Sequence, residues 1–302
     1  MQQVSDFLSQ LLEPDRLSSV VDIGANPIDG DPPYKKMLDS GLCQVTGFEP
    51  QQDALQALLV RKGPLETYLH YAIGDGNKHT LFRCLASGMT SLYKPDQHQL
   101  AVFNDFEKLG EVTSTQAIAT RRLDDISEII HLDMLKIDIQ GGELAVFESG
   151  RNKLSEAVAI QTEISFIPLY EEQPLFWEID RELRQQGFIP HAFDAVKRWP
   201  IAPYSHPENN RQALNQLLEA DVVYIRDFIN SETMTDEQVK HLALLAHHCY
   251  GSHDLVTRCL SILIRRGLIP ETATQRYQSY IFPGYNFSTE EIQVNYSISF
   301  DL

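Results

Sequence analysis

Two acidic residues close neighbouring apolar runs of the sequence. Asp138 lies near the end of DMLKIDI (133–139), and Glu163 lies near the end of AVAIQTEISF (157–166). Both runs are predicted to be buried strands, and the carboxyl ends of such strands meet at the ligand-binding edge of an α/β sheet. A carboxylate held there can act as a general base that takes the proton of an acceptor hydroxyl. Either residue is a candidate base, and we favour Glu163.

Other interpretations of these side chains stay open. Glu163 can equally serve as a cap or a salt-bridge partner, and together with Asp138 it can hold a divalent cation through carboxylate oxygens. No third ligand is evident, so we predict no metal. His191, in a later predicted strand, is an alternative base, although a lone histidine in a strand is more often packed or solvent-facing. Glu143 opens a predicted helix, where the helix dipole favours a carboxylate.

The histidine-rich segment HHCYGSH and the four cysteines offer weaker signals. His247, His248 and His253 straddle a predicted helix end at Gly251, where histidines stabilise the last carbonyl groups. The cysteines form no C-x-x-C pair, so neither a zinc site nor a disulfide framework is indicated. We expect buried, reduced thiols and helix-end histidines.

The segment VVDIGANPIDG has the order strand, glycine turn, helix that usually holds a nucleotide. A dinucleotide turn needs G-x-G-x-x-G, but Asn26 replaces the second glycine, and no G-K-[ST] follows. The acidic residues of the turn, Asp22 among them, would repel a pyrophosphate. They suit the ammonium and sulfonium charges of S-adenosylmethionine. Glu49, 27 residues after Asp22 in GFEP, is placed to accept the ribose hydroxyls.

Short β-branched runs alternate with helical patterns over the first three quarters of the chain, which predicts a doubly wound, mainly parallel α/β sheet. The expected strands are 17–23, 43–49, 66–73, 133–139, 157–166, 188–196 and 220–228, with a hairpin strand at 78–85 and an added strand at 115–123. The expected helices are 31–41 (Asp31 as N-cap, Pro32 at the first position), 51–63, 141–150 and 173–187. The polar stretch 86–112 has no clear pattern.

The pattern changes after Phe228. Three successive helical segments follow, at 235–251, 253–267 and 270–280, and a strand is expected only at 292–300. We therefore place a domain boundary there: residues 1–228 form a nucleotide-binding domain of Rossmann-like type, and residues 229–302 form a mainly helical extension. The apolar stripe of these helices indicates a core or a homodimer surface.

Four motifs together, VVDIGAN, GFEP, LKIDIQGGEL and QTEISF, resemble the FkbM-type methyltransferases over roughly residues 18–195. The element K-I-D-x-x-G-x-E is the most diagnostic. The resemblance implies a doubly wound methyltransferase fold, S-adenosylmethionine as cofactor, and methyl transfer, mostly to hydroxyl oxygens of sugars or natural products. Variable loops, such as 86–112 and 165–175, are expected to build the acceptor pocket.

The resemblance also implies roles for individual residues. The cofactor loop is Asp22, Gly24, Ala25 and Asn26; Glu49 holds the ribose; Ala72 and Ile73 flank the adenine; Asp138 lies at the methionine end beside the reaction centre. Two departures stand out. Gln140 replaces the glutamate common in this motif, and the proline-rich residues 27–33 reshape the loop, which we interpret as a rigid wall for the methionine end.

The composition limits the partners. The 302 residues carry a formal charge of −17 without a basic run, so nucleic acid is excluded as a substrate. No apolar run approaches the ~20 residues of a membrane span, and the N-terminus lacks the pattern of a signal peptide, so a cytoplasmic protein is expected. A small-molecule or saccharide acceptor fits best. Two further hypotheses are a catalytically silent methyltransferase-like scaffold and, less favoured, an NAD-dependent oxidoreductase.

Overall fold

The structure is a computed structural model that describes residues 2–26 and 30–284. The chain folds into two compact units. One is Ser18–Asp227, and the other combines the described parts of Met1–Leu17 and Phe228–Leu302. The candidate site residues all belong to the first unit.

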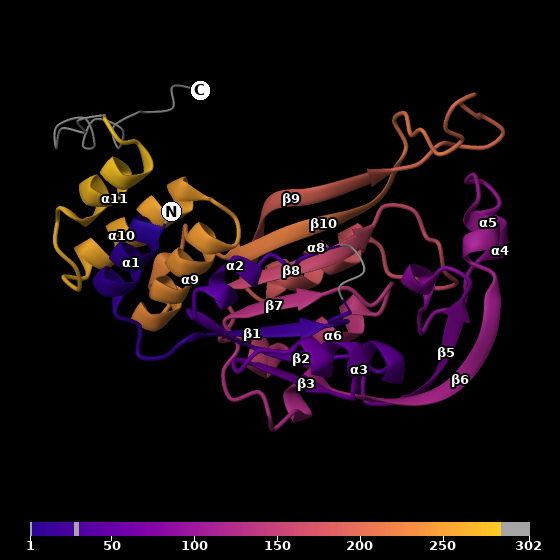
Figure 1. Cartoon of the computed structure of the whole chain (residues 1–302), viewed down its shortest axis with the longest axis horizontal. Helices are drawn as coiled ribbons and strands as arrows, with labels where there is room; N and C mark the ends of the chain where they lie inside the picture. Colours follow the sequence, from indigo (N-terminus) through magenta and orange to yellow (C-terminus); the bar gives the residue numbers. More distant parts are fainter. Residues whose placement is uncertain (1, 27–29, 285–302) are drawn as a thin grey trace. The chain divides into compact units, whose positions relative to one another are not determined.

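The first unit is built on a seven-stranded sheet (Figure 1). Its strands, in spatial order, are β3 (Glu66–Leu69), β2 (Cys43–Phe48), β1 (Ser18–Ile23), β7 (Met134–Ile137), β8 (Ala159–Ser165), β10 (Leu217–Arg226) and β9 (Phe188–Arg198). The first five are parallel, whereas β10 runs antiparallel to both of its neighbours. The predicted mainly parallel, doubly wound α/β class is confirmed.

One face of this sheet forms the main hydrophobic core. Alternate residues of the central strands, such as Ile23, Ile137 and Ile160, pack there against α6 (Glu143–Ser149) and α8 (Phe176–Gln185). The intervening positions, such as Asp22, point to the opposite face because side chains alternate along a strand. The polar side chains of the site therefore lie on the second face and at the carboxyl ends of the strands.

The entry to α2 differs from the expected one. The helix spans only Lys35–Asp39, and its N-cap is Tyr34, which makes no side-chain cap bond. The predicted cap at Asp31 and helix start at Pro32 are wrong. A residue that precedes proline is disfavoured in the helical region, and Pro33 imposes this on Pro32. The helix α3 (Gln52–Arg61) lies where expected.

A smaller three-stranded sheet interrupts the alternation between β3 and β7. Its order is β4 (Ala72–Ile73), β6 (Val112–Arg121) and β5 (Lys78–Cys84), so the expected strand 66–73 is divided between two sheets. The connection between β5 and β6 contains α4 (Gln97–Leu100) and α5 (Phe106–Leu109). Phe103 and Phe106 pack with Tyr170 and Leu218 in a separate small core.

The second unit is helical. It contains α1 (Gln2–Leu12), α9 (Asp236–His248), α10 (His253–Arg265) and α11 (Ala273–Ile281). The three C-terminal helices match the expected segments, and α1 packs on α9 and α11, with the Phe7 and Tyr280 rings 4.9 Å apart. The expected strand 292–300 lies outside the described residues. Among the described helices, none is both long and apolar enough to span a bilayer.

Candidate functional site

The turn after β1 lies against the ends of β2 and β7. The backbone N–H groups of Gly24 and Ala25 donate to Phe48 O, at 3.0 and 3.2 Å. Gly24 has a φ of +78°, and a Cβ there would lie 2.1 Å from Asp138 O. Only glycine fits this combination of backbone angle and close approach. The structure thus brings the predicted cofactor loop, which continues to Asn26, next to Asp138.

Asp22 is buried under this turn, and both of its carboxylate oxygens have protein partners. Tyr34 Oη donates to Oδ2 at 2.5 Å, and Lys136 Nζ lies 3.4 Å from Oδ1. Burial lowers the pKa of Lys136, but the carboxylates of Asp22 and Asp138 outweigh it and raise that pKa overall. Asp22 therefore ties the turn to the start of α2 and to β7. Sequence reasoning missed both partners, although Lys136 belongs to the quoted K-I-D motif.

Glu49 follows β2 and is 2% exposed. Its Oε1 accepts a hydrogen bond from Gln51 N at 2.6 Å, and no residue in the described part of the chain donates to Oε2. Burial raises the pKa of the Glu49 carboxyl. Within the described residues, Glu49 thus keeps one carboxylate oxygen free beside the Gly24 turn. A buried free oxygen of this kind suits a ligand that donates hydroxyl hydrogens, such as the ribose of S-adenosylmethionine.

The predicted adenine-flanking residues are buried as well. Ala72 and Ile73 form β4, which pairs in parallel with Thr120 and Arg121 rather than with the main sheet. Ile73 nevertheless belongs to the same hydrophobic cluster as Phe48, beside the end of β2. The structure therefore places Ile73 in the core to which Phe48, the residue before Glu49, also belongs.

Asp138 and Glu163 are joined by one amide group. Gln140 Nε2 donates to Asp138 Oδ1 at 3.0 Å and to Glu163 Oε2 at 2.6 Å. Glu163 is 4% exposed, and its second oxygen, Oε1, accepts from Lys197 Nζ at 2.8 Å. Lys197 Nζ also lies 3.5 Å from Glu219 Oε2. The two predicted base candidates thus occupy one connected polar cluster.

The electrostatics of this cluster increase the proton affinity of the Glu163 carboxylate. Burial, followed by the negative charges of Asp138 and Glu219, raises the pKa of Glu163, whereas Lys197 lowers it. Burial lowers the pKa of Lys197, but its two glutamate partners raise it overall, so the lysine is charged. A carboxylate whose pKa is raised towards the working pH is a better general base than a solvated one.

Glu143 has a structural role in the same motif. Its two oxygens accept hydrogen bonds from the backbone N–H groups of Ile139 and Gly141, each at 2.9 Å. Burial raises its pKa to about 7, in spite of these backbone donors. Glu143 therefore fixes the loop that carries Asp138 and Gln140, which agrees with its expected place at the start of a helix.

His191 is not brought to this cluster. It lies between Pro190 and Ala192, which are in register through β10 with Ile160 and Gln161, at the amino end of β8. The end of β9 instead supplies Lys197, one residue beyond the strand expected from the sequence. Because antiparallel pairing through β10 sets this register, no local pattern could have selected Lys197.

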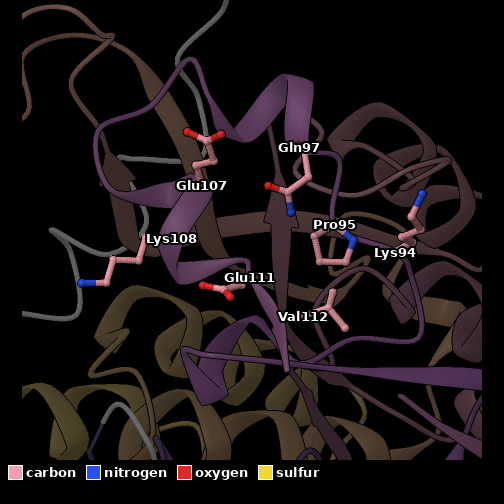
Figure 2. A pocket seen from close by; sticks show the side chains of 7 residues that line it. All are labelled: Lys94, Pro95, Gln97, Glu107, Lys108, Glu111 and Val112. Carbon is pink, nitrogen blue, oxygen red and sulfur yellow. The ribbon is translucent and has the colours of Figure 1, made fainter. Parts of the chain in front are cut away.

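Two further observations concern metal binding and a surface pocket. Within the described residues, no group of three or more histidine, cysteine, aspartate and glutamate side chains is arranged to hold a metal ion. Figure 2 shows a pocket of about 530 Å³ on the segment between β5 and β6, lined by charged side chains such as Lys94, Glu107 and Glu111. None of the predicted site residues lines this pocket.

Comparison with known proteins adds the family. No curated protein matches the sequence. Among solved structures, the chain is similar to magnesium protoporphyrin IX methyltransferase from Synechocystis PCC 6803 with bound SAM (11% identity, TM-score 0.34, covering 75% of this chain and 79% of that chain). It is also similar to precorrin-6y C5,15-methyltransferase from Geobacter metallireducens GS-15 (12% identity, TM-score 0.36, covering 74% and 88%). The model of the methyltransferase FkbM domain matches residues 22–190, more than half of the chain. The chain therefore belongs to the FkbM family of S-adenosylmethionine-dependent methyltransferases.

Proposed function

We propose that this methyltransferase acts on a hydroxyl oxygen of a sugar or secondary-metabolite acceptor, with Glu163 as the general base. The observation that carries this proposal is the Gln140 amide, which bonds the carboxylate beside the cofactor loop, Asp138, and the carboxylate at the end of β8, Glu163. A base at this position stands next to the place where the methyl donor is expected.

S-adenosylmethionine, when bound, supplies an electrophilic methyl group on a sulfonium. Glu49 would accept hydrogen bonds from its ribose, Ala72 and Ile73 would flank its adenine, and the turn of Gly24 to Asn26 would receive its amino-acid end. Glu163 would take the proton of the acceptor hydroxyl as that oxygen receives the methyl group, and the departing sulfur would leave as neutral S-adenosylhomocysteine. In-line alignment of the two reactants supplies much of the rate.

The acceptor pocket is proposed to form from segments 86–112 and 165–175, which are joined to each other. Asp96 N donates to Leu169 O at 3.0 Å, and Glu171 N donates to Lys94 O at 2.8 Å. Tyr170 Oη reaches Gln140 Oε1 at 3.1 Å, so this pair of segments borders the cluster. An acceptor held by them would lie beside Glu163.

The test is Glu163→Gln, assayed with a panel of methyl glycosides and hydroxylated aromatic compounds through the S-adenosylhomocysteine formed. We expect kcat to fall by roughly 100-fold or more, because a positioned base contributes about 10²–10⁴, while S-adenosylhomocysteine affinity stays within about threefold. Glu156→Gln, at an exposed carboxylate outside both acceptor segments, should leave turnover and affinity unchanged. Equal losses of turnover and cofactor affinity in Glu163→Gln would refute the role.

A further inference from the structure

Gln140 adopts a backbone conformation that is unusual for its side chain. Its φ is +59°, in the left-handed region that glutamine rarely occupies. Ser91 Oγ donates to Gln140 O at 2.6 Å, which holds the peptide in place. A strained non-glycine residue beside candidate catalytic groups indicates that its side chain is needed there.

Both polar atoms of the Gln140 side chain, Nε2 and Oε1, form hydrogen bonds. The Nε2 group donates to Asp138 and Glu163, and Oε1 accepts from Tyr170 Oη at 3.1 Å. These partners fix the amide orientation, because only the NH₂ end can donate to two carboxylates. Tyr170 is itself buried, and its hydroxyl lies 3.3 Å from Met89 O.

We propose that Gln140 is a positioning residue for methyl transfer. Its side-chain NH₂ group holds Asp138 and Glu163 in place, and its side-chain oxygen, Oε1, links them through Tyr170 to the proposed acceptor segment 165–175. This inference rests on the proposed role of Glu163. The amide does not touch the reacting atoms. It sets the direction of the base and favours the ionised form of both carboxylates, because hydrogen bonds to a charged carboxylate stabilise that form.

The neighbourhood of Glu163 makes this hydrogen bond consequential. Titratable and charged groups face the glutamate from the elements packed around it: Lys136 on β7 and Asp138 after it, Lys197 on β9, Glu219 and Asp221 on β10, and Tyr170 from the loop after β8. Four carboxylates, counting Glu163 itself, thus share this face, and of the two lysines only Lys197 forms an ion pair with Glu163 that the structure describes. Removing the amide donor would shift this balance towards protonation of Glu163.

Gln140→Glu tests the proposal, since it keeps the shape of the side chain and replaces the donor by a carboxylate. We expect the acidic limb of the kcat/KM profile to move to higher pH by about one unit or more, with activity at neutral pH reduced at least tenfold and regained at higher pH. Gln185→Glu, the same change at an exposed position of α8, should leave the profile unmoved.

Gln140→Gly separates positioning from folding, because glycine suits the positive φ. We expect a melting temperature no lower than that of the wild type, together with a loss of turnover of at least tenfold. An unmoved pH profile in Gln140→Glu, or full turnover in Gln140→Gly, would overturn the proposal. Absence of methyl transfer by the wild type on the whole panel would instead count against the proposed function, so the two failures are distinguishable.

Discussion

Lys197 Nζ lies 2.8 Å from Glu163 Oε1, although the two residues belong to strands that are separated by β10. The antiparallel strand between them carries Glu219, whose carboxylate lies 3.5 Å from the same ammonium. At this end of the sheet, the positive charge of Lys197 is therefore shared between two buried glutamates. This balance determines how readily Glu163 ionises.

Lys197→Ala should raise the pKa of Glu163 further and destabilise the fold as pH rises. The folded pKa of Glu163 lies above its unfolded value, so the cost of burying its charge is absent at low pH and grows as pH rises through the folded pKa. We expect a loss of about 2 kcal/mol at pH 8 and less at pH 5, since the lysine is 41% exposed. Urea unfolding at both values measures this.

The matched control is Lys94→Ala, which breaks the exposed pair with Glu171 and should cost less than about 0.5 kcal/mol at either pH. A loss in Lys197→Ala that does not grow from pH 5 to pH 8 would contradict the assigned balance.

Gly24→Ala should disrupt the cofactor turn for two reasons, its positive φ and the contact of the new Cβ with Asp138 O. We expect a loss of stability above about 2 kcal/mol and loss of S-adenosylhomocysteine binding. Gly41→Ala isolates the backbone effect, because Gly41 has a φ of +70° and open space around it. It should cost only about 1 kcal/mol. Similar losses in the two variants would show that the close approach is unimportant.

The helical unit should lose stability in acid through His247. The hydroxyl of Tyr277 bonds the Nδ1 atoms of both His247, at 3.0 Å, and His253, at 2.8 Å. Burial, then the neighbouring His248 and His253, lowers the pKa of His247 to about 4 from its usual 6.5. The unfolded chain therefore takes up a proton before the folded one, so stability falls as pH drops from about 6.5 to 4.

Helix unfolding followed by circular dichroism at pH 7.5 and pH 4.5 measures this effect. His247→Asn should reduce the acid-induced loss by about 2 kcal/mol, whereas His98→Asn, at an exposed residue of the other unit, should leave it unchanged. The same loss in His247→Asn as in the wild type would rule out His247 as the cause.

The sequence predicted the parallel core well because short apolar runs alternate there with helical patterns. The alternation of apolar runs and helices places Asp138 and Glu163 at strand ends without knowledge of pairing. It does not give the direction of β10 or its place between β8 and β9, since periodicity carries no information on either. The predicted location in the cytoplasm and self-association through the C-terminal helices stay predictions.

The partners of the site residues were beyond sequence reasoning for a physical reason. Tyr34, which bonds Asp22, is the N-cap of α2, whereas the capping pattern placed the helix start at Pro32. Lys197 reaches Glu163 through pairing across two strands, and the amide of Gln140 bridges two carboxylates through a local left-handed turn. Such contacts depend on long-range register and on backbone angles. The sequence showed which residue types are expected to bind a cationic ligand, but it did not show which side chains hold those residues in position.

Isothermal titration calorimetry with S-adenosylhomocysteine, with NAD in parallel, tests the assigned cofactor site most directly. We expect micromolar binding of S-adenosylhomocysteine, no binding of NAD, and affinity at least about 30-fold weaker in Glu49→Ala, because the buried acceptor for two ribose hydroxyls is lost. Glu128→Ala, an exposed carboxylate, should bind like the wild type. Binding of NAD alone, or of neither compound, would contradict the assignment of this site to S-adenosylmethionine.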